Sequence, residues 1–511
     1  MEARGLFKNA GIITFGALIS RFLGLAREIT YANKFGTTGA RDALRVGSYI
    51  PVTLSNLLVA GAVSAVFIPL FTRYVFQGKK EDLKEIFAVV VNQFTLLMIG
   101  LVIGLTLLSP VIIQIQAPGF EVERYQMALQ VFRIALPSVY FLGLAALSAG
   151  TLNSLKVFGV PTMGGIVFNA AIVFITIFFA DSMGVVSVAY ALVIGSIGQF
   201  LIQYIWIERF GLGYRFTKKL THPAMKEIYA LILPVLIGSG VNYLAPFIET
   251  FFSSFLSEGM PGALDYAFKT SQFPIGIFAL AISAVVFPSL SENIICNDKQ
   301  ALEKNLAWAL KFILLIIVPA TAGLMVLSAP IVRVMLQHGK FGVDSTMMTS
   351  KALFWYSTAL IPWSVTAVLV KIFYSYHDTK TPVFVALITV LFLFCADWIL
   401  VKCLSYQGLA IGSAIAAYVN ASILWFIVKK KYNCIRWLCV ARTMVLTTTA
   451  SLVMTGVLYY LSAHIIPTFF SLESKLHQTW EVLLLLVVGV FVYGSLLFLF
   501  GRRDIKEVIG K

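Results

Sequence analysis

Stretches of roughly 20 consecutive apolar residues, the length that crosses the hydrocarbon core of a bilayer, recur along almost the whole chain. Of the 511 residues, 59% are hydrophobic and 12% are charged, a charged fraction about half that of a soluble domain. The sequence therefore predicts an all-α polytopic membrane protein with about fourteen transmembrane helices and no soluble domain. The apolar windows are 9–30, 46–72, 87–113, 127–152, 160–180, 184–206, 228–256, 264–290, 307–334, 350–375, 382–403, 408–428, 440–466 and 480–501.

The positive charges gather in alternate loops between these windows. The net charge is +15, and the Lys and Arg residues stand in short runs such as 429–431. Cytoplasmic loops carry the excess of Lys and Arg in membrane proteins, so the pattern predicts that both termini are cytoplasmic. The same rule explains the basic charge of the chain without a nucleic-acid partner.

An internal repeat divides the chain. Residues 62–69 (AVSAVFIP) return at 281–288 (AISAVVFP), a shift of 219, and the segment 153–161 is echoed at 374–382, a shift of 221. An even number of helices separates the copies, so the copies share one orientation and are related by an axis along the membrane normal. We expect a six-helix lobe at 1–206, a cytoplasmic linker at 207–227, a second six-helix lobe at 228–430 and two additional helices at 431–511.

Ionisable residues inside or beside the predicted helices are the candidate functional residues, because an unpaired charge in a bilayer is costly. For binding an anionic cargo, the candidates are Arg21, Arg27, Asp42, Arg133 and Lys269. Asp42 could instead orient one of the arginines or cap a helix. Guanidinium groups suit phosphate because they form paired hydrogen bonds with its oxygens. The alternative for each cation is that the side chain extends to the headgroup interface and binds no cargo.

Two acidic residues in the second lobe, Glu249 and Asp397, are candidates for coupling to Na⁺ or H⁺, or for serving as counter-ions of Lys269. The chain has no HExxH, P-loop or GxSxG motif, and its five histidines are scattered. We therefore expect a transporter, with no enzymatic activity, no metal site and no cofactor. Its driving force would come from an ion gradient, the membrane potential or the cargo gradient.

Several short motifs form a set over roughly residues 8–430. The segment 20–28 (SRFLGLARE) fits the pattern S-R-x-L-G-x-x-R-[DE], and Asp42-Ala43 follows it. Further members are 117–120 (APGF), 287–290 (FPSL), 339–341 (GKF), 373–375 (FYS) and 378–382 (DTKTP). This set resembles the MurJ (MviN) family of the multidrug/oligosaccharidyl-lipid/polysaccharide exporter superfamily.

The resemblance implies a function as well as a fold. It implies two six-helix lobes in a V shape and two extra helices that form a lipid-tail groove. The implied cargo is lipid II, the undecaprenyl-pyrophosphate-linked disaccharide-pentapeptide, moved from the inner to the outer leaflet of the bacterial cytoplasmic membrane by alternating access. Membrane lipids and cell-wall synthesis proteins would be the partners. By position, Arg21, Arg27 and Asp42 match residues that function in the family requires.

The chain departs from the family pattern at several charged positions. Ser55-Asn56 stands where the family usually has an arginine pair, Ala60 replaces a Glu, and the Arg-x-x-Glu of the eighth helix appears as Lys269 and Gln272. Two alternatives to lipid II transport therefore stay open: a flippase for another polyprenyl-pyrophosphate-linked glycan, and an ion-coupled drug or metabolite antiporter of the same superfamily. A membrane scaffold that has lost transport is a third.

Overall fold

The structure is a computed structural model that describes residues 2–58, 67–78, 80–214, 222–434, 437–465, 474–502 and 507. Within these ranges the chain forms helices and no strand, so the predicted all-α class is confirmed. The chain divides into two compact units, one made of Met1–Gly262 with His338–Phe341 and one made of Ala263–Gln337 with Gly342–Lys511.

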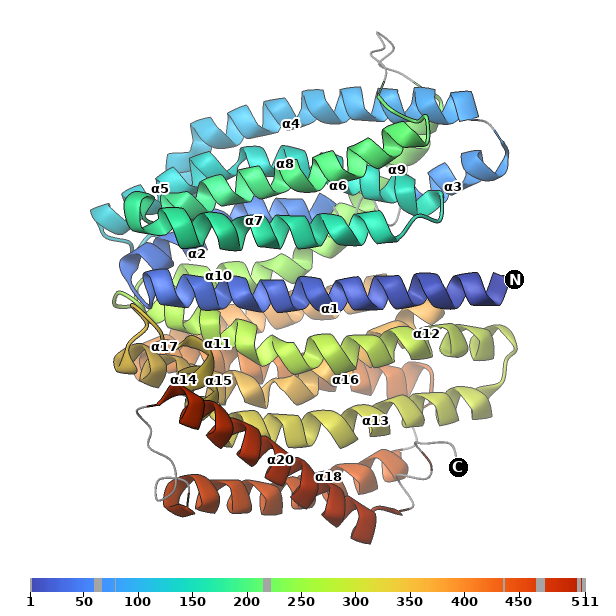
Figure 1. Cartoon of the computed structure of the whole chain (residues 1–511). Helices are drawn as coiled ribbons and strands as arrows, with labels where there is room; N and C mark the ends of the chain where they lie inside the picture. Colours follow the sequence, from blue (N-terminus) through green and yellow to red (C-terminus); the bar gives the residue numbers. More distant parts are fainter. Residues whose placement is uncertain are drawn as a thin grey trace. The chain divides into compact units, whose positions relative to one another are not determined.

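Unit 1 is a bundle in which α1 packs on α7, α7 on α8, α2 on α5 and α6 on α8 (Figure 1). Its core consists of apolar side chains such as Phe71, Ile86 and Phe132, all fully buried. The helices are α1 (Glu2–Phe35), α2 (Gly39–Asn56), α3 (Ile68–Phe76), α4 (Lys80–Gln116), α5 (Val122–Ala135), α6 (Pro137–Ser154), α7 (Gly159–Met183), α8 (Val186–Arg209), α9 (Ala224–Gly240), η2 (Val241–Tyr243) and α10 (Leu244–Ser253).

Unit 2 is a second bundle in which α12 and α16 pack on each other and on α13, while α18 packs on α13 and α20 (Figure 1). One apolar core runs through α12, α13, α16 and α17. The helices are α11 (Met260–Pro274), which starts at the end of unit 1, η3 (Ile275–Ala279), α12 (Leu280–Ile295), α13 (Lys299–Val326), α14 (Ser328–Leu336), α15 (Val343–Thr358), α16 (Leu360–Ser375), α17 (Lys380–Lys431), α18 (Trp437–Tyr460), η4 (Leu461–Ile465) and α20 (Lys475–Phe500).

Prolines explain two of the breaks along the spans. Helices α15 and α16 meet at a bend of 41°, and Pro362 has no N–H to donate to the carbonyl of Thr358, where α15 ends. The π-helix η3 directly follows Pro274, the last residue of α11. A membrane helix tolerates such breaks because neighbouring helices and local 3₁₀ or π turns satisfy the freed backbone groups.

The backbone carries the repeat that the sequence predicts. Of the eleven residues with positive φ in the described ranges, ten form five pairs at nearly constant spacing. The pairs are Gly36 and Gly259, Gly78 and Asn297, Lys156 and His377, Gly184 and Ser405, and Gly211 and Asn433, with spacings of 223, 219, 221, 221 and 222 residues. Each positive-φ position of these pairs in the first copy thus returns in the second at a shift of 219 to 223, close to the shift of 219 to 221 seen in the sequence.

Ten helices of the described residues are long and apolar enough to cross a membrane, or eleven if the bent pair α15–α16 counts as one span. The predicted number of fourteen remains a prediction. The windows 382–403 and 408–428 fall within the single helix α17, which has a non-helical residue at Ser405. The second predicted helix, 46–72, includes residues 59–66, which lie outside the described residues, as does Ala60.

The predicted domain boundaries also stay a prediction. They follow the sequence repeat, whereas the compact units follow contacts, by which α9 and α10 belong to unit 1. Most of the predicted linker 207–227 is described, but residues 215–221 lie outside the described residues.

Candidate functional site

A network of arginines and carboxylates lies inside unit 1, and it begins on α1. The Arg27 guanidinium donates to Glu28 Oε1, at 3.1 Å from Nη2, and to Asn169 Oδ1 of α7 at 3.3 Å. The other oxygen of Glu28 accepts from Arg41 Nη2 of α2 at 3.2 Å. Arg41 is almost fully buried and its guanidinium carbon lies 5.3 Å from the centre of the Tyr31 ring. Glu28 therefore bridges two guanidinium groups on two helices.

Asp42 caps the start of α11. Its two carboxylate oxygens accept hydrogen bonds from the backbone N–H groups of Gly259 and Gly262, each at 2.8 Å, and Arg124 Nη1 lies 3.8 Å away. Asp42 is fully buried, so these donors replace the water that the carboxylate would otherwise bind. Of the three roles considered for Asp42, which are cargo contact, orientation of an arginine and helix cap, the structure shows the helix cap.

The cap is reciprocal. The Glu258 carboxylate, just before α11, accepts from the backbone N–H of Gly39, the first residue of α2, at 2.5 Å. Negative charge is favourable at the N-terminus of a helix, where backbone N–H groups have no partner within the helix. The starts of α2 and α11 thus each receive a carboxylate from the other's segment.

The first turns of α2 supply a further cation. Arg45 Nη2 lies 2.6 Å from Glu249 Oε1 of α10, and Arg45 Nη1 donates to the carbonyl of Pro261 at 2.7 Å. Both side chains of this ion pair are less than a tenth exposed. Glu249 is therefore occupied by Arg45, a partner that the sequence did not suggest.

Arg41 and Arg45 were missed because the second predicted window starts at residue 46 and leaves them in a loop. The signal was present in the spacing. Residues four apart lie on one face of a helix, and the segment Arg41-Asp42-Ala-Leu-Arg45 puts two cations on a face with a carboxylate beside them. Starting the helix at Gly39 would have identified all three as residues of α2.

The other predicted residues of unit 1 have different surroundings. Arg21 on α1 is exposed and makes no ion pair or side-chain hydrogen bond among the described residues. Arg133 on α5 is exposed and donates to Ser109 Oγ of α4 at 2.8 Å. Ser55 is buried and bonds the carbonyl of Pro51, whereas Asn56 is exposed. Arg27 and Asp42 lie in the network, and Arg21 and Arg133 lie outside it.

In unit 2, the two predicted residues lie on different helices. Lys269 Nζ lies 2.9 Å from Asp265 Oδ2, one turn earlier on α11, and its side chain is 37% exposed. Asp397 on α17 is fully buried, with a carboxylate oxygen packed against Gly412 so closely that any side chain there would collide with it. Among the described residues, no group of three or more His, Cys, Asp or Glu residues is arranged to hold a metal ion.

Long apolar helices enclosing buried arginines and carboxylates define a multi-pass membrane protein of the transporter class. A sequence model of the family described as "Lipid II flippase MurJ" matches residues 31–478, and the chain belongs to this family. The predicted resemblance is thereby confirmed. Membership places the chain among transporters and not among enzymes.

Individual relatives agree with the family assignment over the full length. The chain is 28% identical to the "Probable lipid II flippase MurJ" of Rickettsia prowazekii (strain Madrid E), an alignment that covers 99% of this chain and 98% of the relative. A solved structure titled "Lipid II flippase MurJ, inward closed conformation" matches with a TM-score of 0.82 and 26% identity, over 96% of this chain and 99% of that chain.

A more distant structure shares the fold alone. It is described as the inward-facing conformation of a multidrug resistance MATE family transporter of the MOP superfamily, with a TM-score of 0.70 and 15% identity over 81% of this chain and 94% of that chain. The match fits the predicted superfamily.

Proposed function

We propose that this chain is a lipid II flippase, which moves the undecaprenyl-pyrophosphate-linked disaccharide-pentapeptide from the inner to the outer leaflet by alternating access. Family membership over residues 31–478 and the full-length match to a lipid II flippase structure support this proposal. The proposed location is the bacterial cytoplasmic membrane with both termini inside, which the loop charges support. Cell-wall synthesis proteins are proposed partners.

The arginine network of unit 1 is the observation that carries the proposal. Arg27 and Arg41 both contact the buried carboxylate of Glu28, and Arg45 contacts that of Glu249. Arg21 adds an exposed cation on α1. A pyrophosphate needs several donors in fixed geometry, and guanidinium groups supply them in pairs. Arg27 is the best placed, because its side chain is 27% exposed while it already has partners that orient it.

Arg21 is the second proposed cargo ligand, since its side chain is exposed and holds no carboxylate in the described ranges. Asp42 acts on the cargo indirectly, by holding the starts of α2 and α11 together. Lys269 and Arg133 remain candidates, and Lys269 stands where the family has an arginine. With Ser55 and Asn56 in place of the usual arginine pair, a related polyprenyl-pyrophosphate glycan is the second candidate cargo.

The two extra helices are proposed to hold the cargo's lipid tail. Helices α18 and α20 border an apolar groove of about 680 Å³ in unit 2. Its lining comprises Leu438, Ala441, Arg442, Val445, Leu446, Thr449, Ala450, Val453, Leu496 and Phe500. Eight of these ten side chains are apolar, which suits the hydrocarbon of a polyprenyl chain.

Coupling to Na⁺ or H⁺ is part of the proposal. Of the two candidate carboxylates, Glu249 forms an ion pair with Arg45 at 2.6 Å, and Asp397 of α17 is fully buried; both stay candidates. If Asp397 couples transport to an ion, Asp397→Asn will make the transport rate independent of the gradient of that ion. An unchanged dependence would assign coupling elsewhere.

The test is rescue of bacteria depleted of their own lipid II flippase, with lipid II translocation measured in the same cells. The natural chain should rescue growth. Arg27→Ala should lower translocation by about ten- to a hundredfold, the loss expected when a charge-assisted hydrogen bond to the cargo is removed, and Arg27→Lys should restore part of it.

Arg209→Ala is the matched control, because Arg209 lies at the end of α8 against Trp206 and away from the network. It should translocate normally. Failure of the natural chain to rescue, at normal abundance, would refute lipid II as the cargo. Normal translocation by Arg27→Ala would remove Arg27 from the cargo site and leave the family function standing.

A further inference from the structure

Unit 2 contains a second, smaller pocket, and its lining residues precede those of the apolar groove in the chain. It has a volume of about 410 Å³ and lies between α14, α15 and α17. Its lining comprises Ser328, Ser350, Lys351, Phe354, Trp355 and Gln407. Four of these six side chains are polar or charged and two are aromatic, so the pocket is amphipathic.

Its polar lining includes no acidic residue, and each polar side chain carries a hydrogen-bond donor. The hydroxyl of Ser350 donates to the carbonyl of Met347. Lys351 is exposed and makes no ion pair or hydrogen bond from its side chain in the described part of the chain. The Gln407 amide oxygen accepts from Trp355 Nε1 at 3.3 Å. The NH₂ of Gln407 carries two N–H donors, and the hydrogen bond to the Tyr406 hydroxyl uses one of them. Ser328 adds a hydroxyl and is largely buried. An ammonium, an amide NH₂ and a hydroxyl suit an anionic oxygen-rich group such as phosphate.

Two aromatic side chains, Phe354 and Trp355, form an apolar wall of the pocket. The rings of Phe354 and Trp355 lie 5.2 Å apart in an edge-to-face arrangement, and Trp355 is fixed by its bond to Gln407. Tryptophan is enriched where a membrane protein meets the headgroup region. An apolar wall beside phosphate donors suits an amphiphile better than a free ion.

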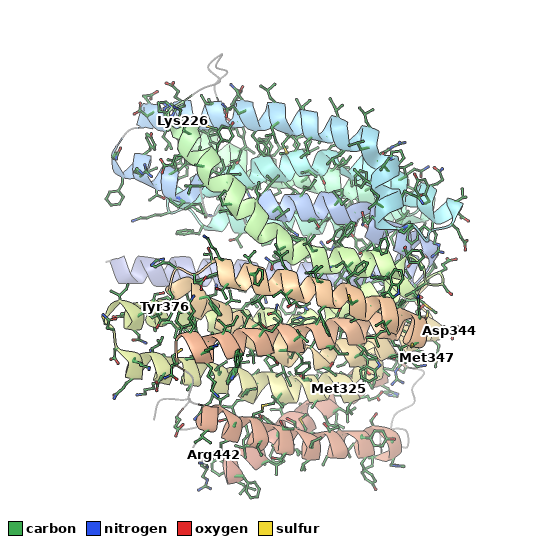
Figure 2. All side chains as sticks on the ribbon, turned by 180° about the vertical axis from the view of Figure 1, so that it is seen from behind. Lys226, Met325, Asp344, Met347, Tyr376 and Arg442 are labelled. Carbon is green, nitrogen blue, oxygen red and sulfur yellow. The ribbon has the colours of Figure 1, made fainter. Side chains whose placement is uncertain are left out.

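The pocket lies in the first half of the span that α15 and α16 form together. Lys351 is eight residues from Val343, the start of that helix, which is about 12 Å along the axis. Figure 2 shows Asp344 and Met347 near this end of the unit 2 helices and Tyr376 near the other end. Asp344, the nearest acidic residue on α15, is seven residues from Lys351, about 10 Å along the axis and thus largely screened in salt.

We propose that this pocket binds the phosphate headgroup of a membrane amphiphile, with Lys351 and Gln407 on the phosphate and Trp355 beside the start of the chain. The site is separate from the arginine network of unit 1 and does not depend on the proposed transport function. Both an anionic phospholipid and a polyprenyl phosphate carry this headgroup chemistry.

Native mass spectrometry of the purified full chain in detergent tests the proposal, with phosphatidylglycerol, undecaprenyl phosphate, inorganic phosphate and diacylglycerol as probes. The first two should bind to the natural chain, and diacylglycerol, which has the chains but no phosphate, should not. Lys351→Gln should weaken binding of the bound lipid by about tenfold or more. Whichever of the two phosphate lipids binds more tightly identifies the source of the headgroup.

The matched control is Lys402→Gln, an identical change at an exposed lysine of α17 that lies over Trp398 and outside the pocket. It should bind lipid as the natural chain does. Thermal unfolding of both variants checks that they are folded. Equal lipid binding by Lys351→Gln and Lys402→Gln would overturn the proposal, as would equal binding of diacylglycerol or saturation by inorganic phosphate alone.

Discussion

At the scale of single residues, the buried charges of unit 1 are held by specific partners. Glu28 lies between Arg27 and Arg41, and Glu249 is bonded by Arg45. Removing such charges from water costs free energy. Removing one member of a buried ion pair therefore strongly destabilises the fold, because the other charge stays buried without a counter-ion. The pairs therefore fix which residues can be exchanged alone and which only together.

The Arg45–Glu249 pair makes this testable. Arg45→Ala should lower the free energy of unfolding by about 3–5 kcal/mol, because it leaves the Glu249 carboxylate buried without its guanidinium partner. The double variant Arg45→Ala with Glu249→Ala should lose less than Arg45→Ala alone. Thermal unfolding in detergent micelles measures both.

The exposed pair Arg73–Glu227 is the control, with side chains 52% and 43% exposed and a distance of 2.6 Å. Arg73→Ala should change the stability little, as is usual for exposed pairs. If both arginine variants lost the same stability, the pair on α2 and α10 would be no more than a surface contact.

Asp378, in the turn between α16 and α17, should make the stability of the fold depend on pH. Its carboxylate accepts from the N–H and hydroxyl of Thr381, from Lys431 Nζ at 2.6 Å and from the Tyr432 hydroxyl. Burial alone would raise the pKa of Asp378, but the hydrogen bonds from Lys431 and Thr381 together hold this pKa well below its ordinary value.

A lowered pKa in the folded state stabilises the fold above the unfolded value of about 4, and the stabilisation is lost as the pH falls below it. The natural chain should therefore have a higher Tm than Asp378→Asn at pH 7. Lowering the pH from 4 toward 3 should reduce this difference in Tm between the natural chain and Asp378→Asn. Tm measured in one detergent across this range tests it, and a gap that stayed constant down to pH 3 would contradict the assigned role of the carboxylate.

At the scale of elements, the repeat explains why some residues of unit 2 are strained. Gly184 has φ 59° and ψ −145°, and Ser405, its counterpart in the repeat, has φ 52° and ψ −139°. Glycine adopts this conformation readily, whereas a residue with a Cβ is strained in it. The sequence predicted a break between 403 and 408, and the structure locates it at Ser405 within α17.

Ser405→Gly should therefore raise stability by about 1 kcal/mol, since relief of about 1–3 kcal/mol of strain exceeds the entropic penalty of glycine, about 0.5–1 kcal/mol. Gly184→Ser should lower stability. Ser422→Gly, an exposed position inside the same helix α17, is the control and should be slightly destabilising. A Tm that falls for Ser405→Gly would show that the serine side chain contributes more than its backbone conformation costs.

At the scale of the whole molecule, hydropathy and motifs predicted the helical class, the membrane setting, the repeat and the family. These predictions rest on long or repeated sequence patterns, so an error of several residues in a helix boundary does not change them. The candidate site was predicted only in part, because a partner such as Arg45 for Glu249, 204 residues away in the chain, depends on tertiary packing. A start of the second helix placed seven residues too late was enough to hide Arg41 and Arg45.

Native cysteines test the predicted topology. Cys296 follows α12, Cys395 lies within α17 and Cys403 lies next to its kink, and all three are exposed. With cytoplasmic termini, the turn after α12 is inside and the kink of α17 is outside. Cys296 and Tyr376 lie at the same end of the unit 2 helices, because Ser291 of α12 and Ser375 of α16 are hydrogen-bonded at 3.0 Å. Asp344 lies at the opposite end (Figure 2).

In variants that keep one of these cysteines, a membrane-impermeant maleimide should label Cys403 in intact spheroplasts and Cys296 only after the membrane is permeabilised. Cys395 should stay unlabelled in intact and in permeabilised spheroplasts, because the reactive thiolate does not form in hydrocarbon. It is the control for a cysteine that is exposed to lipid and not to water. Labelling is read by the mass of the purified chain. The reverse pattern, with Cys296 labelled in intact spheroplasts and Cys403 protected, would place the termini outside and remove the charge bias as a guide to orientation.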